Sequence, residues 1–526
     1  MNRNRPRLLV LGLDAFDPAV ASRLKAEGRL PALERLESRS RRFSLDPGPD
    51  RYTGLAWDHF SSGLRPEESR RWSAVSFEPA EYQISQPTTR SQPFTERLDT
   101  RTVVFDVPYF DLREAAAGGM VSWGAHDPGV EPASRPTGLA DEILEKFGPY
   151  PASDYVYGHV WPDAEATRAM AAAMVAAVER RAEITSWLLT QRLPGWDLAM
   201  AVVGEYHSAT EAFWHGWEES HPLHGLPSAE PARQGLVAVY EALDRMLGRL
   251  LDELGDTPLL AFTPHGMGRN LADVPAMLLL PELLYRNSTG KQGFTPDPRW
   301  PLDGSGGPGV AEAGNWSEAV LPRLHIEGSV QAAPWWRFWA QPEAPLAQPS
   351  DYGLHWMPAT RYREAWPAMK AFALPSYYDA RVRVNLEGRE GRGIVPHGRY
   401  REALDEVAAL LESCRDPRSG EPLEIDIERR LQGDPMDRDS TDADLVVRFR
   451  KDYYAFDHPS LGRIGPAPCR RTGGHTGGLG VGYHWAPGVT GSPDLGLFET
   501  LDVPGAVAAL TGAAASNRLA AALTQP

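Results

Sequence analysis

The sequence predicts an α/β fold in which helices pack on both faces of a mostly parallel sheet. Short apolar runs over 8–13, 102–108, 198–204 and 258–263 have the length of buried strands. Helix-like segments separate them, such as the Ala-rich stretch over 164–192 and the segment over 229–254. Near-continuous apolar strands that alternate with helices are typical of parallel sheets covered on both faces. Because 526 residues exceed what one compact core holds, we expect more than one unit.

The first strand ends at a carboxylate. The residues from Leu8 to Leu13 are apolar or Gly, and Asp14 follows them directly. In an open sheet of this kind the carboxyl ends of the central strands face the ligand crevice. Asp14 is therefore placed where a hard cation could be held. It could equally be the N-cap of a helix expected over 18–26, and the strand alone leaves both roles open.

The stretch over 51–66 predicts a helix that opens at Thr53 and closes at Gly63, with Pro66 beyond it. Gly just past a helix and Pro after it form the expected end signal. A Thr at a helix N-terminus is most often a cap. The helix dipole and the free amides there also favour an attacking oxyanion or a phosphate.

Two more strands and one late loop lead to residues that can bind a ligand. His207 and Glu211 follow the third strand, and on a helix their i, i+4 spacing puts them on one face. Such a pair is more often a surface hydrogen bond than a metal site. The fourth strand leads to His265. The Gly-rich loop over 470–478 surrounds His475 and begins with two arginines, Arg470 and Arg471, which could clamp an oxyanion.

Composition narrows the class of protein. The net charge of -16 argues against binding to nucleic acid or to an anionic membrane. Two cysteines supply no disulfide framework, and the basic first residues are not followed by an apolar run of signal-peptide length, so we expect a cytoplasmic protein.

From 279 to 358 Gly, Pro and Trp dominate and the strand–helix alternation stops, which indicates an inserted cap or lid.

These landmarks, in this order, resemble the alkaline phosphatase superfamily, and within it the type I phosphodiesterase/nucleotide pyrophosphatase-like phosphohydrolases. The matching stretches are Leu11–Asp14, Gly28–Pro31, Thr53–Pro66, Phe213–Trp214, His265–Gly266, Arg383–Glu390, Asp416–Gly420 and Gly474–His475. The resemblance implies an alkaline-phosphatase-like three-layer sandwich with two metal ions at the strand ends. We therefore expect 1–278 and 359–526 to form the two parts of the core, with 279–358 as the inserted cap.

The resemblance also implies a ligand set for each metal. One ion would be held by Asp14, Thr53 and His265 together with an Asp at position 264, and the other by residues 207 and 211 and His475. This chain departs from the pattern at three positions. Pro264 stands where the family has Asp, His207 where it has Asp, and Glu211 where it has His.

These three departures from the family pattern differ in their effect on metal binding. His207, Glu211 and His475 keep two imidazoles and one carboxylate, a competent set for zinc, with iron or manganese as alternatives. Pro264 offers no side-chain ligand. We therefore expect one divalent metal to bind firmly and a second weakly, unless another carboxylate compensates. The candidates for that are Asp17, Glu205 and Asp127.

The leading functional hypothesis is hydrolysis of a small phosphate ester, above all a diester or nucleotide-like substrate, with Thr53 as the nucleophile. A sulfate ester or phosphonate is the alternative substrate. One alternative is a non-hydrolytic enzyme, because two His and one carboxylate also form the ligand set of mononuclear iron enzymes. Another is a catalytically inactive family member that keeps the pocket and a Trp-rich lid.

Overall fold

The computed structural model describes residues 7–48, 54–87, 89, 91–157, 162–300, 308–311, 316–328, 354–430, 433–439, 442–489 and 493–525. The chain divides into two compact units. The first comprises Met1–Ser69, Thr88–Arg269 and Arg471–Pro526, and the second comprises Arg70–Pro87 and Asn270–Arg470. The predicted boundaries at 278 and 358 stay a prediction, and much of the predicted cap (301–307, 312–315 and 329–353) lies outside the described residues.

A nine-stranded sheet forms the centre of the first unit, in the order β19-β2-β18-β9-β1-β8-β5-β6-β7. Its strands are β1 (Leu8–Leu13), β2 (Ser40–Asp46), β5 (Thr102–Phe105), β6 (Gly118–Val121), β7 (Ala133–Arg135), β8 (Leu198–Val203), β9 (Leu259–His265), β18 (Leu479–Trp485) and β19 (Asp494–Glu499). The run β9-β1-β8-β5-β6 is parallel throughout, and β18 and β7 are antiparallel to their neighbours. The predicted mostly parallel α/β sheet is confirmed.

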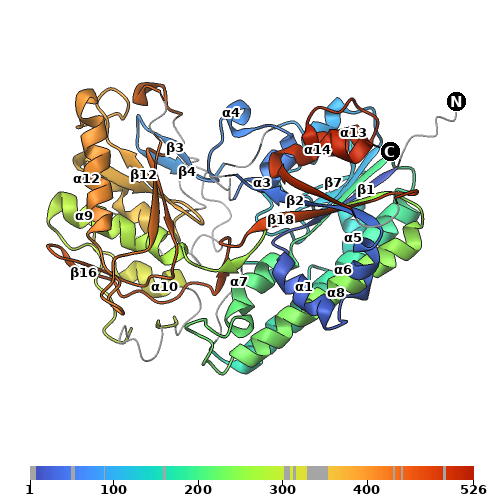
Figure 1. Cartoon of the computed structure of the whole chain (residues 1–526), viewed down its shortest axis with the longest axis horizontal. Coiled ribbons are helices and arrows are strands. Elements are labelled where there is room, and N and C mark those ends of the chain that lie inside the picture. Colours follow the sequence, from blue (N-terminus) through green and yellow to red (C-terminus); the bar gives the residue numbers. More distant parts are fainter. Residues whose placement is uncertain are drawn as a thin grey trace. The chain divides into compact units, whose positions relative to one another are not determined.

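Helices cover both faces of this sheet, with α1, α6 and α8 on one side and α13 and α14 on the other (Figure 1). The helices of the unit are α1 (Pro18–Ala26), α2 (Pro31–Glu37), α3 (Ala56–Ser62), α4 (Pro66–Ser69), α5 (Leu139–Phe147), α6 (Ala164–Trp187), α7 (Glu205–Trp217), α8 (Ala229–Leu254), α13 (Val503–Leu510) and α14 (Arg518–Thr524). Leu9, Leu11 and Leu13 of β1 join the apolar core with residues of α6 and α8. The arrangement is the expected three-layer sandwich.

Two local details fix the start of the site. Asp17, and not Asp14, caps α1, because its side chain accepts hydrogen bonds from the amides of Ala19 and Val20, both at 2.9 Å. The capping role considered for Asp14 is therefore wrong. Gly63 ends α3 in the left-handed conformation (φ 65°), as predicted, whereas α3 begins at Ala56 and Thr53 lies outside the described residues.

Strand β18 lies inside the sheet, but its sequence does not have the pattern of a buried strand. It contains Gly480 and Gly482, and Gly weakens the strand signal because it adds no apolar side chain. The packing explains the residue choice. A Cβ added to Gly482 would lie 2.1 Å from the Phe43 ring of β2, and one added to Gly480 would lie 2.2 Å from the Thr263 carbonyl oxygen of β9.

The second unit contains an antiparallel sheet in the order β11-β12-β14-β13. Its strands and main helices are β11 (Ala371–Leu374), β12 (Ala380–Val384), β13 (Ile425–Arg429), β14 (Leu445–Phe449), α9 (Leu280–Thr289), α10 (Trp316–Val320) and α12 (Tyr400–Glu412). Short two-stranded pairs add β3 (Ser76–Glu78) with β4 (Gln83–Ser85) and β15 (Phe456–His458) with β16 (Gly462–Ile464).

The stretch Arg383–Glu390, one of the landmarks of the resemblance, forms buried ion pairs in this unit. The Arg383 guanidinium donates to Glu390 at 2.8 Å, and Arg389 donates to Asp444 at 2.7 Å. Here the motif holds β12 to the loop that follows it and to the start of β14. Among the described helices of the whole chain, none is long and apolar enough to cross a membrane.

Candidate metal centre

The site residues meet at the carboxyl edge of the central strands in the first unit. Strand β1 is parallel to both β8 and β9, so their carboxyl ends lie at the same edge of the sheet. Asp14 follows β1, helix α7 begins two residues after β8, and His265 is the last residue of β9. The predicted helix that carries His207 and Glu211 is confirmed as α7.

His475 reaches this edge through a short antiparallel pair. Strand β17 (Gly473–Gly474) pairs with β10 (Gly268–Arg269), which follows β9. The Thr472 amide donates to the Glu211 carbonyl oxygen at 2.8 Å, and a Cβ on Gly473 would lie 2.1 Å from the Thr210 carbonyl oxygen. The Gly-rich loop therefore packs directly on α7, which only a residue without a side chain allows at position 473.

A buried ion group ties the loop after β6 to the start of α7. The Arg181 guanidinium of α6 is fully buried and donates to Asp106 at 2.8 Å and to Glu205 at 2.9 and 3.0 Å. Asp106 in turn accepts from the amides of Trp123 and Gly124 at 2.8 and 2.9 Å. This group fixes the loop that ends at His126 relative to the helix that carries His207 and Glu211. It also engages Glu205, one of the three carboxylates considered as a replacement ligand.

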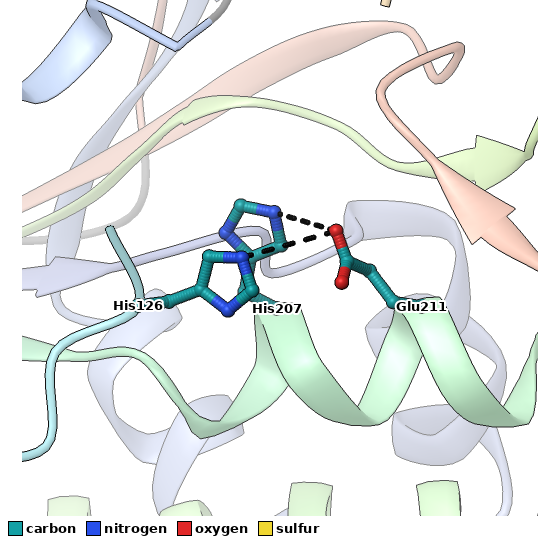
Figure 2. Close-up of side chains that lie close together, drawn as sticks. All are labelled: His126, His207 and Glu211. Atoms are coloured by element: carbon teal, nitrogen blue, oxygen red, sulfur yellow. Dashed lines mark ion pairs between the residues drawn. The ribbon is translucent and has the colours of Figure 1, made fainter. Parts of the chain in front are cut away.

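Three side chains converge at the site: His126, His207 and Glu211 (Figure 2). Each offers one ligand atom, and the three atoms lie within 4.8 Å of one another. The Oε1 atom of Glu211 lies 3.3 Å from His207 Nε2 and 3.9 Å from His126 Nε2. The two imidazole rings are stacked, with centroids 3.7 Å apart and an interplanar angle of 18°. All three residues are buried, Glu211 completely.

The tautomer of His207 follows from its partner. Its Nδ1 lies 3.0 Å from Asp14 Oδ2, and the Trp57 indole N–H donates to Asp14 Oδ1 at 2.9 Å. A carboxylate accepts hydrogen bonds, so Nδ1 of His207 carries the proton. Its Nε2 then presents a lone pair toward Glu211, and this nitrogen has no hydrogen-bond partner within the described ranges.

The tautomer of His126 follows in the same way. Its Nδ1 lies 3.3 Å from Ser208 Oγ, and the Ser208 hydroxyl donates to the Val156 carbonyl oxygen. Because the hydroxyl proton is used there, Ser208 accepts from His126 Nδ1. The Nε2 atoms of both histidines are therefore free of protons and face the same carboxylate oxygen.

Lone pairs that converge on a carboxylate repel one another unless a cation or proton lies between them. The side-chain Oε2 of Glu211, also buried, has no hydrogen-bond partner among the described residues. Burial holds the pKa of His207 well below its usual value and lowers the pKa of His126 to about 3. Neutral imidazoles with a fixed Nδ1 proton are the form that binds metal ions. The residues present therefore fit a divalent cation.

Arg471 also contacts this carboxylate. Its Nη1 atom donates to Glu211 Oε1, the oxygen that both imidazoles face. Its side chain is buried, and burial lowers the pKa of Arg471 to about 10. Arg470 is in the second unit, where it donates to Asp273 and lies over the Trp356 ring at 4.5 Å. The expectation that both arginines bind substrate stays a prediction.

The other predicted ligands lie beside the cluster. The His475 ring centroid is 4.6 Å from that of His207 and 4.5 Å from that of His265. His265 Nδ1 lies 3.2 Å from the Gly266 carbonyl oxygen. Burial lowers the pKa of His475 and raises the pKa of Asp14. The pairing of His475 with His207 and Glu211 around one ion stays a prediction.

Asp17 and Asp127, the other two carboxylates considered as substitutes for the ligand missing at position 264, lie in different places. Asp17 caps α1 and also accepts from the Met267 amide at 3.1 Å. Asp127 lies next to the cluster, with Oδ2 3.9 Å from His126 Nε2. Its backbone is in the left-handed region (φ 46°), which is uncommon for a residue other than Gly.

His126 was not among the residues predicted from the sequence. It follows β6, whose sequence, Gly-Gly-Met-Val, is too short and too rich in Gly to read as a strand. The available signal was the pair His126-Asp127 after an apolar run. Once β6 is known to be parallel to β5, this pair falls at the same carboxyl edge as Asp14.

No protein-family model matches the sequence, and no curated protein matches it. Among solved structures, the chain is similar to phosphonoacetate hydrolase from Sinorhizobium meliloti, in complex with phosphonoacetate (14% identity, TM-score 0.49) and with phosphonoformate (13%, 0.48). It is also similar to human ectonucleotide pyrophosphatase/phosphodiesterase 5 (9%, 0.45). Each likeness covers 97% of this chain and 96% of the other. The resemblance of the chain to the alkaline phosphatase superfamily rests on the order of its sequence motifs.

Proposed function

We propose that this protein is a metal-dependent hydrolase of small phosphate esters that works with a single divalent metal held by His126, His207 and Glu211. The observation that carries the proposal is the convergence of two proton-free imidazole nitrogens on one buried carboxylate. Two nitrogens and one oxygen leave a fourth position open on zinc, the pattern of catalytic zinc sites. Iron and manganese accept the same donors.

In this proposal Asp14 orients a ligand instead of binding the metal. Both of its oxygens already accept N–H groups, one from Trp57 and one from His207. A carboxylate behind a metal-binding imidazole fixes its tautomer and raises its basicity. With Pro264 in place of a further carboxylate, the second metal position of the family loses two of its ligands. A single ion therefore accounts for the donors that remain.

Thr53 supplies the nucleophile in this proposal, since it matches the family motif and precedes α3, whose Trp57 contacts Asp14. Its Oγ would attack phosphorus and expel the alcohol, and water would then release phosphate from Thr53. The metal, when bound, supplies positive charge that stabilises the developing oxyanion. Burial of His126, His207 and Glu211 keeps bulk water from screening that charge.

The contact between Arg471 and Glu211 favours a second candidate function, a metal-free binding protein derived from such a hydrolase. A guanidinium on Glu211 neutralises the carboxylate without a metal, and Pro264 removes a ligand of the family pattern. In that case the site would bind a ligand and leave it unchanged.

Metal analysis and a hydrolysis assay separate the two functions. Protein purified without a polyhistidine tag is analysed for metal, and then tested with nitrophenyl phosphate monoesters and diesters in the presence of zinc, manganese or iron. We expect one metal per chain and turnover that Thr53→Ala abolishes and Thr53→Ser partly keeps, because Ser retains the attacking oxygen. If Thr53 were not the nucleophile, Thr53→Ala would leave turnover in place. Absence of turnover in the wild type with every metal refutes the hydrolase.

A further inference from the structure

Arg471 is hydrogen-bonded to Glu211 Oε1, the oxygen atom that a metal ion would use as a ligand. Its Nη1 donates to Glu211 Oε1, which His207 Nε2 approaches at 3.3 Å and His126 Nε2 at 3.9 Å. A zinc ion bound to these three residues would lie about 2.0–2.2 Å from each ligand atom. The guanidinium and the ion would then share one small, buried volume.

The position of Arg471 is fixed by the backbone around it. The next residue, Thr472, bonds to the Glu211 carbonyl oxygen through its amide at 2.8 Å and its hydroxyl at 3.1 Å. Gly473 then packs against the Thr210 carbonyl oxygen. These contacts hold the start of the Gly-rich loop against the backbone of α7 at Thr210 and Glu211. The guanidinium therefore reaches the carboxylate from a rigid support.

We propose that Arg471 is a built-in competitor of the metal: it holds Glu211 in the metal-free protein and must leave Oε1 before the ion binds. This inference rests on the proposed function, because it requires the metal site. The charges agree with it. The carboxylates of Asp14 and Glu211 together carry two negative charges. With the Arg471 guanidinium beside them the net charge is one negative, whereas without it a divalent ion meets both negative charges and binds more tightly.

The competition predicts how metal affinity depends on residue 471. We expect Arg471→Met to bind zinc at least about tenfold more tightly than the wild type, the size of effect that one neighbouring charge has on an ionisation equilibrium. Zinc affinity is measured by titration against a chromophoric chelator, and the visible spectrum of the cobalt(II)-loaded protein reports whether the ligand set is unchanged. Neither readout depends on turnover.

A matched control lies just past the end of α7. Arg269 pairs with Glu218, the residue directly after this helix, as Arg471 pairs with Glu211, but the ligand pair His126 and His207 faces Glu211. Arg269→Met should leave the zinc affinity as it is in the wild type. An equal gain in both variants would mean that a general change in charge, and not competition at Oε1, is responsible.

Loss of Arg471 leaves Glu211 buried without its cation, which is strongly destabilising when no other ion replaces it. Zinc should take that place. We therefore expect Arg471→Met to be soluble and folded when it is produced with zinc, and to unfold at lower temperature than the wild type once zinc is chelated. Failure to fold both with and without zinc overturns the inference, because zinc then does not substitute for the guanidinium.

The remaining outcomes separate this inference from the function on which it rests. Equal zinc affinity in the wild type and in Arg471→Met overturns the competition and leaves the metal-dependent hydrolase standing. Zinc binding by Arg471→Met but not by the wild type supports the competition and refutes the metal-dependent hydrolase, since the wild type then holds no metal. Absence of zinc binding in both proteins overturns both proposals.

Discussion

Replacing Asp14 by Asn tests whether this carboxylate binds the metal or orients a ligand. In the structure Asp14 accepts one hydrogen bond from Trp57 at 2.9 Å and one from His207 at 3.0 Å. Asn has a single carbonyl oxygen, so one of these donors would face an NH2 group. If that oxygen stays with His207, the imidazole keeps its tautomer but loses the negative charge behind it.

The size of the effect distinguishes the two roles. Loss of a carboxylate behind a metal-binding His lowers metal affinity by about 10- to 100-fold, which corresponds to about 1.4–2.7 kcal/mol. Loss of a ligand itself would cost far more and would change the geometry of the ion. We therefore expect Asp14→Asn to bind one zinc with affinity reduced by that factor and to give a cobalt(II) spectrum close to that of the wild type.

Asp17 provides the control, because it is a second buried carboxylate three residues along the chain that caps α1. Asp17→Asn should change stability by no more than about 1–2 kcal/mol and leave zinc affinity unaltered. The reasoning is refuted if Asp14→Asn abolishes zinc binding or changes the cobalt spectrum to one of fewer ligands, or if it has no more effect than Asp17→Asn.

Two further predictions concern the lost ligand and acid stability. Pro264→Asp should raise the metal content from one to two ions per chain, provided that the backbone keeps its hydrogen bond from Thr500 at 2.8 Å; two ions already bound by the wild type would show that another carboxylate, such as Asp127, has taken over. The second prediction concerns His484 of β18, where burial and the nearby Arg41 lower the pKa to about 4. Between pH 6.5 and 4 only the unfolded chain binds that proton, so the free energy of unfolding should fall as the pH falls, by at most about 3 kcal/mol from this residue, and the fall should end near pH 4. Denaturant titrations at pH 7 and 4.5 should therefore show a smaller difference for His484→Gln than for the wild type; an equal difference would mean that His484 is protonated when folded.

The sheet could be predicted where strands are mostly apolar and could not where Gly alternates along a strand. Strands β1, β8 and β9 are mostly apolar, with Gly12 their one glycine, and their prediction from the sequence is confirmed. Strand β18 lies between β2 and β9, yet it alternates Gly with larger residues because Phe43 packs where a side chain at position 482 would be. The local sequence around Gly482 does not show that Phe43, more than four hundred positions earlier in the chain, packs against it.

The site shows the same limit more sharply. His207 and Glu211 could be found because they lie four residues apart on one helix, so their proximity is a property of local geometry. His126 could not, because its place depends on the pairing of β6 with β5 and on the Arg181 group that fixes the loop. The position of Arg471 likewise depends on how the loop before His475 packs on α7.

His126, which the sequence pattern does not predict, and Arg471, which it predicts only as a substrate-binding residue, both face Glu211. The pattern predicts Asp14 and His475 as ligands of two ions, whereas the contacts in the structure make Asp14 a partner of His207 and put His126 and Arg471 around Glu211. In the proposed metal centre, the His126 imidazole would add a ligand to the ion and the Arg471 guanidinium would oppose its binding. The proposal therefore makes metal affinity depend on a balance between these two residues, neither of which appears in the ligand set implied by the resemblance. A substitution at either position should move that balance without altering the fold of the sheet, because both side chains come from loops at its carboxyl edge.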